Sequence, residues 1–213
     1  MILKYYGHAF FSLSLENGTE IAFDPYDGFY QYPKRNVRAD ICLMSHHHYD
    51  HDSVASVSAD ALLIDQPGVH KPAEGVTIRG ISTWHDEVQG AKRGANTFYV
   101  VEAEGMRIGH AGDLGHVPTA AQRAQIGRLD VLMLPVGGYY TIDCQTALEV
   151  CRLLQPTVMI PMHYRTEYDE EMPIADLNDF LKMARAEDTQ MPLVRLVQAD
   201  MSERAEILTL KIS

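Results

Sequence analysis

The feature that most constrains this chain is a histidine-rich segment that directly follows a short apolar run. Residues 41–51 read Ile-Cys-Leu-Met-Ser-His-His-His-Tyr-Asp-His. The apolar run is typical of a buried strand, and residues two apart on an extended chain project to the same side. His46 and His48 can therefore reach one metal ion together. Asp50 and His51 follow where the chain turns, so they can face a second ion nearby.

Imidazole nitrogen and carboxylate oxygen are the natural ligands of zinc and of its neighbours in the first transition row. The alternative is an exposed histidine cluster without function, or an adventitious metal site. The segment is internal, contains an acid at a suitable offset and follows a core strand. These features favour a built metal site.

Four ligands do not complete two metal sites, so more must come from elsewhere in the chain. His85, Asp113 and His163 each lie at the end of a predicted strand or just beyond it. Gly112 and Gly115 also fit a tight turn that would bring Asp113 close to the ions. Together with the first segment they make seven ligands, the number that two ions sharing one carboxylate would use. The predicted ligand set is His46, His48, Asp50, His51, His85, Asp113 and His163.

The remaining sequence alternates predicted strands with helices. We expect strands at residues 2–6, 9–15, 21–23, 41–44, 61–64, 76–82, 97–101, 106–108, 131–134, 158–160, 193–197 and 206–211. Helices are expected at 118–126, from Asp143 to Leu154, at 174–186 and from Asp52 or Ser53 onward. Residues 26–38 read as an aromatic-rich loop. This order suits two packed sheets with helices outside them, in a single domain over residues 1–213.

Composition narrows the partners. The 213 residues carry a net charge of −11 with no Lys/Arg run, which argues against long nucleic acid as a ligand. No apolar stretch approaches a membrane span, and we expect no secretory signal before the first strand. Cys42, Cys144 and Cys151 are odd in number, so we expect buried thiols in a reducing cytoplasm. A small-molecule substrate fits these limits, and a homo-oligomer stays open.

The ligand pattern resembles that of the metallo-β-lactamase superfamily. The family's His-x-His-x-Asp-His motif is matched by residues 46–51, and its next metal-binding histidine by His85. Its Gly-Asp turn, whose aspartate bridges the metals, is matched by Asp113, and its final histidine by His163. The resemblance implies an α+β fold, the four-layer αββα sandwich.

Several shorter stretches resemble the branch that includes L-ascorbate-6-phosphate lactonase-like proteins. They are residues 6–10, 23–25, 110–115, 134–138 and 160–164. The resemblance covers residues 4–168. Three positions depart from the usual pattern: Ser45, Leu114 and the acidic Asp86. Of these, Asp86 bears on the surroundings of the metal ligands or on the preferred charge of the substrate.

The resemblance implies a binuclear hydrolase in which a metal-bridging hydroxide is the nucleophile. In our hypothesis the first ion is held by His46, His48 and His85. The second ion is held by Asp50, His51 and His163. Asp113 bridges both ions and Asp50 also orients the hydroxide, so these two are the catalytic candidates. Zinc is the first choice of metal, and manganese, iron or nickel also suit the ligands.

A small ester-like molecule is the expected substrate, with a lactone or sugar-phosphate lactone as first choice. A phosphodiester is the alternative within the hydrolases. The second class of function is a non-catalytic, metal-dependent binding or regulatory protein. The complete ligand set argues against that class, since a chain freed from catalysis need not keep all seven residues.

Other polar residues leave two interpretations open. His8 and Asp24 either orient ligands through hydrogen bonds or have a structural role in the hairpin. Tyr139 and Tyr140 either line the pocket or belong to a half-buried loop. His47 is interpreted as a packing or ligand-supporting residue. The remaining residues are expected to be near ligands in sequence only (His110 and Tyr164) or on the surface (His70 and His116).

Overall fold

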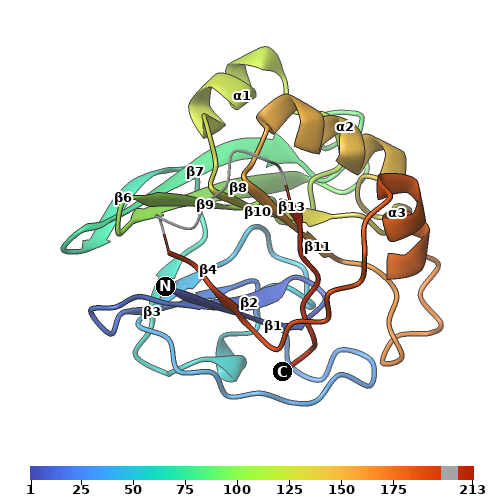
Figure 1. Ribbon diagram of the computed structural model, residues 1–213. Helices are drawn as coiled ribbons and strands as arrows, with labels where there is room; N and C mark the ends of the chain where they lie inside the picture. Colours follow the sequence, from blue (N-terminus) through green and yellow to red (C-terminus); the bar gives the residue numbers. More distant parts are fainter. Residues whose placement is uncertain (198–205) are drawn as a thin grey trace.

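Two mixed β-sheets face each other across the middle of the molecule (Figure 1). The structure, a computed structural model, describes residues 1–197 and 206–213. The six-stranded sheet has the order β12 (Val194–Arg195), β1 (Ile2–Gly7), β2 (Phe10–Ser14), β3 (Glu20–Phe23), β4 (Ile41–Leu43) and β5 (Leu62–Ile64). The seven-stranded sheet has the order β13 (Glu206–Ile207), β11 (Val158–Met162), β10 (Val131–Pro135), β9 (Met106–His110), β8 (Ala95–Ala103), β7 (Val76–Trp84) and β6 (Gly68–Ala73).

Strand direction determines where the polar loops meet. In the six-stranded sheet β3 and β4 are parallel, and β1 runs the same way because β2 is antiparallel to both of its neighbours. In the other sheet β9, β10 and β11 are parallel, and β7 shares their direction because β8 is antiparallel to β7 and β9. The loops that follow these strands therefore leave each sheet at one edge, where α/β proteins commonly build their sites.

The main core lies between the sheets. On β2, Phe11 and Leu13 belong to this core, whereas Phe10 belongs to a second apolar cluster on the outer face of the sheet. On β4, Leu43 faces the main core and Cys42 the outer cluster. Both faces of the six-stranded sheet are thus covered, which explains why its central strands read as continuous apolar runs.

Three α-helices cover the seven-stranded sheet on its outer side: α1 (Ala120–Ile126), α2 (Cys144–Leu154) and α3 (Leu177–Ala184). Thr119 begins α1 with a reciprocal capping box, and Asp143 and Asp176 cap α2 and α3 with their carboxylates. The helices predicted at 118–126, 143–154 and 174–186 are present, although α1 and α3 begin two or three residues later than predicted. Within the described residues, none of the helices is long and apolar enough to span a membrane.

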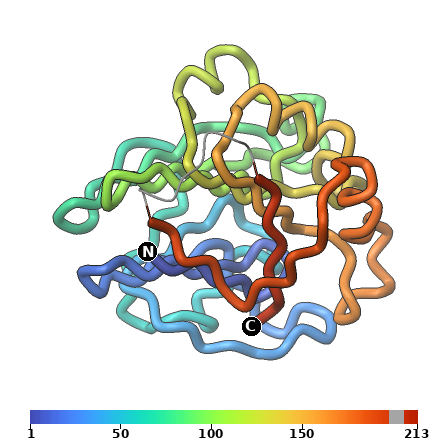
Figure 2. The backbone as a smooth tube through the Cα atoms, in the orientation of Figure 1, coloured from blue at the N-terminus to red at the C-terminus, as the bar shows by residue number. Residues whose placement is uncertain are grey.

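An aromatic loop, residues 26–38, covers the outer face of the six-stranded sheet in place of a helix. Figure 2 shows it as the light-blue tube on the side away from the helices. Tyr26, Phe29 and Tyr32 are buried in the outer cluster. A Cβ at Gly7, where φ is +102°, would lie 2.3 Å from the Tyr32 ring. The loop therefore packs directly against the turn that carries His8.

The helix predicted to start near residue 52 is wrong. The chain forms only η1, a 3₁₀-helix over Val54–Ser56. The backbone N–H of Ser53 donates to Pro25 (2.8 Å), and the carbonyl of Ser56 accepts from Val37 (2.8 Å). Serine and valine are weak helix formers, so these bonds to the aromatic loop outcompete a helical turn. Strand β6 was also missed, because it is an edge strand without alternating burial.

Removing Tyr32 should expose how much the aromatic loop stabilises the fold. Its side chain is 3% exposed, and its hydroxyl donates to Asp169 (3.1 Å). We expect Tyr32→Ala to lower the free energy of unfolding by about 3–5 kcal/mol. Tyr30→Ala, on the same loop but 46% exposed, should cost less than about 1 kcal/mol. Urea unfolding of both variants measures this, and equal losses would contradict a packing role for Tyr32.

Candidate metal centre

Polar side chains from both sheets converge at the shared edge. The six-stranded sheet supplies His8 after β1, Asp24 after β3, and residues 46–51 after β4. The seven-stranded sheet supplies His85 after β7, Asp113 after β9, and His163 after β11. Each of these residues follows a strand running in the same direction, so both sheets contribute side chains to the centre.

Asp113 lies at the middle of this cluster. Its Oδ2 is 3.1 Å from Nε2 of His85 and 3.3 Å from Nε2 of His163. The same oxygen is 3.4 Å from His51 Nε2 and 3.9 Å from His46 Nε2. Four imidazoles thus surround one buried carboxylate oxygen, which is the arrangement expected of a residue shared between two metal ions.

The histidines form two groups, and within each group the ligand nitrogen atoms lie within 4.8 Å of one another. One group is His46, His48 and His85, and the other is His8, His51 and His163. The first group is the trio predicted for the first ion. The second contains His51 and His163 as predicted, with His8 as an additional member. Asp113 contacts both groups.

His8 was predicted at most to orient a ligand, but it reaches the cluster itself. Its Nε2 is 3.1 Å from Asp50 Oδ2 and 3.2 Å from His51 Nε2, and its ring centroid is 4.0 Å from that of His163. Asp50 Oδ2 in turn lies 3.7 Å from His51 Nε2. The signal available in the sequence was a histidine directly after the glycine of a strand-to-strand turn.

Asp24 orients His51 from behind. Its Oδ2 lies 3.0 Å from His51 Nδ1, and its two oxygens accept the N–H and the hydroxyl of Ser45. Because Nδ1 is engaged there, Nε2 of His51 faces the cluster. Burial alone would raise the pKa of Asp24, but the hydrogen bond to His51 and the nearby His110 lower it.

Two predictions about isolated histidines are wrong. His110 is not near the ligands in sequence only: it is fully buried against Phe23, and its Nδ1 lies 4.0 Å from the Asp24 carboxylate. His47 does not pack or support a ligand, because its side chain is 62% exposed and lies near Asp52 and Asp65. The alternation along an extended chain accounts for His47: its neighbours on both sides point inward.

His70 and His116 were expected at the surface, and both are partly exposed. Nε2 of His116 accepts the backbone N–H of Trp84 at 3.1 Å, and Nε2 of His70 lies 3.1 Å from the carbonyl oxygen of Gln66. Both histidines therefore fix local backbone outside the cluster.

Burial and charge shift the pKa values of the clustered histidines in opposite directions. Burial, followed by the neighbouring His51, lowers the pKa of His46 to about 3. Burial opposes protonation of His51 and His163, but Asp113 raises the pKa of both above its ordinary value. The Asp113 carboxylate thus favours positive charge on His51 and His163, and a bound metal ion would compete with protons for these rings.

The donor set fits divalent metal ions. Oδ1 of Asp113 is buried and has no hydrogen-bond partner among the described residues. Imidazole nitrogens approach each other at 3.0 Å (His46 and His48) and 3.2 Å (His8 and His51). Such pairs repel unless a proton or a cation lies between them. Nitrogen and carboxylate donors in this proportion suit zinc, manganese, iron and nickel.

Asp86 has a clear structural role. Its carboxylate is 1% exposed and accepts four backbone N–H groups, from Val88, Gly90, Lys92 and Arg93, at 2.7–2.9 Å. It thereby folds residues 86–94 into a fixed loop that starts directly after His85. On the other side, a Cβ at Gly115 would lie 2.2 Å from Asp86 N, so only glycine lets the Asp113 turn approach this loop.

A cavity of about 350 Å³ opens onto the cluster. It is lined by Tyr30, His48, Tyr49, Asp50, His85, Arg93, Asp113, Tyr140, His163 and Met172. Tyr140 therefore lines the cavity as one interpretation held, whereas Tyr139 is 64% exposed and is absent from that lining.

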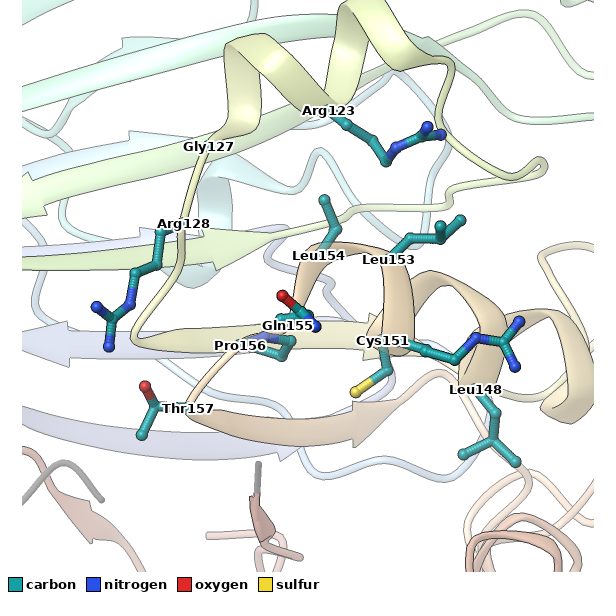
Figure 3. Close-up of a pocket in the computed structure, with 11 residues that line it drawn as sticks. Arg123, Gly127, Arg128, Leu148, Cys151, Leu153, Leu154, Gln155, Pro156 and Thr157 are labelled. Atoms are coloured by element: carbon teal, nitrogen blue, oxygen red, sulfur yellow. The ribbon is translucent and has the colours of Figure 1, made fainter. Parts of the chain in front are cut away.

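A larger hollow of about 910 Å³ lies elsewhere, beside the carboxyl-terminal ends of α1 and α2 (Figure 3). The described residues that line it include neither a carboxylate nor a histidine. Figure 3 shows the side chains of Arg123 and Arg128 pointing away from each other rather than toward one ligand. We therefore place the chemistry at the smaller cavity.

The role of Asp24 can be tested by metal affinity. Asp24→Asn should weaken metal binding about 10- to 100-fold, because His51 loses the charged partner that orients it. Asp52→Asn is the matched control, since Asp52 lies 3.4 Å from the exposed His47 and contacts no predicted ligand. Competition with a chromophoric chelator measures both affinities. Equal effects of the two substitutions would contradict the orienting role.

The Asp86 loop predicts a specific pH dependence in metal-free protein. Burial alone would raise the pKa of Asp86, but the N–H groups of Arg93, Gly90, Lys92 and Val88 lower it from 3.8 to about 2. The ionised carboxylate therefore stabilises the fold above about pH 4, and this stabilisation is lost as the pH falls toward 2. Urea unfolding of wild type and Asp86→Asn should show a difference that shrinks on acidification. A difference independent of pH would refute this account.

Comparisons with known proteins agree with the geometry. Residues 2–163 match the family described as the Beta-lactamase superfamily domain. A UPF0173 metal-dependent hydrolase of Thermoplasma volcanium is 30% identical over 187 residues, covering 76% of this chain and 82% of the relative. The crystal structure of a candidate Zn-dependent hydrolase of the metallo-β-lactamase superfamily from Thermotoga maritima is 35% identical. It covers 99% of this chain and 98% of its own, with a TM-score of 0.80.

Igni18, a metallo hydrolase from Ignicoccus hospitalis, shares the fold at 22% identity and a TM-score of 0.68, covering 98% of this chain and 94% of its own. The expected αββα sandwich is thus confirmed, with the aromatic loop forming its thin outer layer. This chain is a member of the metallo-β-lactamase superfamily.

Proposed function

We propose that this protein is a binuclear metal-dependent hydrolase of a small ester-like substrate, with a lactone or sugar-phosphate lactone as first choice. The observation that carries the proposal is the position of Asp113. Its Oδ2 lies within 3.9 Å of histidines from both groups, His46 and His85 on one side and His51 and His163 on the other. One carboxylate between two histidine groups is what a pair of ions requires.

In this proposal His46, His48 and His85 would hold the first ion. Asp50, His51 and His163 would hold the second, and Asp113 would be shared. When bound, two divalent ions would lower the pKa of bound water to about 7 and polarise the scissile carbonyl or phosphoryl group. Zinc is the first candidate metal, in keeping with the Zn-dependent assignment of the Thermotoga relative.

The protein's own groups act around that chemistry. The Asp50 carboxylate lines the cavity and can accept a hydrogen bond from water, so it orients the nucleophile. His8 contacts Asp50 Oδ2 at 3.1 Å and fixes this carboxylate. Tyr30, Tyr49 and Tyr140 offer aromatic surface to the body of the substrate. A cavity of about 350 Å³ admits a small molecule, which supports a lactone more than a polymeric substrate.

Substitution of a shared or a single ligand should separate this proposal from a metal-free role. We expect Asp113→Ala and His48→Ala to lower bound metal and to reduce turnover by more than about 100-fold, beyond the loss typical of supporting residues. His47→Ala is the matched control: it lies in the same motif, but its side chain is 62% exposed and faces away. It should keep both metal and activity.

Plasma mass spectrometry measures the metal content of each variant. Turnover is measured on a panel of lactones and on an activated phosphodiester, with zinc and with manganese. Two metals per chain with turnover of lactones supports the proposal, and turnover of the phosphodiester alone replaces its substrate class. If Asp113→Ala keeps two metals and full activity, the shared-carboxylate assignment fails. Bound metal with no turnover of any substrate would indicate a binding protein.

A further inference from the structure

Arg93 places a positive charge in the lining of the cavity, although the protein as a whole is acidic. Among the described residues that line the cavity, it is the one with a permanently charged cationic side chain. Its neighbours there include the ligand candidates His48, His85 and Asp113. The chain has a net charge of −11, so a guanidinium beside the candidate ligands indicates a specific role rather than general surface charge.

The loop holds Arg93 in a fixed position. The backbone N–H of Arg93 donates to Asp86 Oδ2 at 2.8 Å, and Gly94 accepts the N–H of His85 at 3.1 Å. The loop is thus closed at both ends next to a ligand candidate. Because Gly115 packs against Asp86 N, the distance between the Asp113 turn and the base of the Arg93 loop is also set.

The guanidinium keeps donors free for a ligand. Nη2 donates to the carbonyl of Tyr139 at 2.9 Å, and the group lies 5.6 Å from the centroid of the Tyr140 ring. Within the part of the chain that the structure describes, Arg93 forms no ion pair with a carboxylate. Arginine has five N–H donors in a planar fork that suits carboxylate and phosphate oxygens. The contacts with Tyr139 and Tyr140 therefore orient the guanidinium group without neutralising its positive charge.

We propose that Arg93 binds an anionic group of the substrate, a carboxylate or a phosphate, at a distance from the scissile bond. The inference rests on the proposed function, because it assigns the substrate class of the same cavity. The anionic group lies against the guanidinium, the body of the substrate contacts the tyrosines, and the ester-like group reaches the metal centre. Neutral esters of equal length lack the first contact and bind more weakly.

Two matched ligand pairs test the proposal on the metal-loaded protein. The first pair, adipate and hexanoate, differs by a second carboxylate and is measured by isothermal titration calorimetry. The second pair, mono-4-nitrophenyl adipate and 4-nitrophenyl heptanoate, is measured as kcat/KM after subtraction of the uncatalysed rate. Wild type should bind adipate about 10- to 100-fold more tightly than hexanoate. Its kcat/KM should be higher by the same factor for the adipate monoester, which carries a free carboxylate, than for the heptanoate ester. This is the range expected of a charge-assisted bidentate contact.

Arg93→Gln should abolish both preferences, and Arg93→Lys should keep part of them because it retains charge but not the fork. Lys92→Gln is the matched control. It removes one positive charge from the same loop, yet Lys92 pairs with Glu87 and does not line the cavity. Replacing one carboxylate of adipate by a phosphonate distinguishes the two anions: a larger gain than with adipate identifies a phosphate group.

The proposal is overturned if wild type shows no preference, if Arg93→Gln retains it, or if Lys92→Gln loses as much as Arg93→Gln. Metal content and melting temperature of each variant establish that the centre and the fold are intact. If wild type hydrolyses neither ester but binds adipate through Arg93, the hydrolytic proposal fails for these esters while the anion site stands. The two proposals can thus fail separately.

Discussion

The centre depends on one buried carboxylate, Asp113, that contacts histidines on two sides. Asp113 can take this position because Gly112, with φ +54°, turns the chain, and because Gly115 leaves no side chain toward the His85 loop. A Cβ at Gly112 would lie 2.4 Å from both Asn96 and Ser45. The backbone N–H of Asp113 is bound by the amide oxygen of Asn96 at 2.9 Å. Close packing of the backbone at these glycines therefore determines the position of the Asp113 carboxylate.

Around this carboxylate, the fold supplies rigid support on both sides. Asp24 and His110 lie behind the ligands of the six-stranded sheet. Asp86 lies behind His85 on the other sheet, with its carboxylate saturated by backbone N–H groups. A carboxylate that is hydrogen-bonded to an imidazole orients the ring and limits its motion, and Asp24 has this contact with His51. The two sets differ in chemistry: one orders a side chain, the other orders a loop.

The sequence was informative wherever a candidate ligand directly followed an apolar run. His46, Asp113 and His163 could be found because a strand end is a local pattern, and the direction of the strands then brings those ends together. The main sheets and the three helices were predictable for the same reason, since periodic burial and capping residues are local.

Other features were not predictable, because they arise from contacts distant in sequence. His8 enters the centre because Tyr32 packs on Gly7, 25 residues further along the chain. Arg93 faces the cavity because four N–H groups fold around Asp86, a loop geometry that no periodicity reveals. The short η1 replaces a predicted helix because the aromatic loop competes for its hydrogen bonds. His47 had a usable signal in the sequence, namely the alternation that points it away from its neighbours.

The division of donors between two sheets has a consequence for biosynthesis. A nascent chain that has emerged only as far as β8 carries the histidine-rich segment and His85, but neither Asp113 nor His163. Such a partial chain offers loose, solvated imidazoles without the carboxylate that joins them. In the proposed binuclear centre, the seven ligands would therefore come together only after the second sheet has closed onto the first.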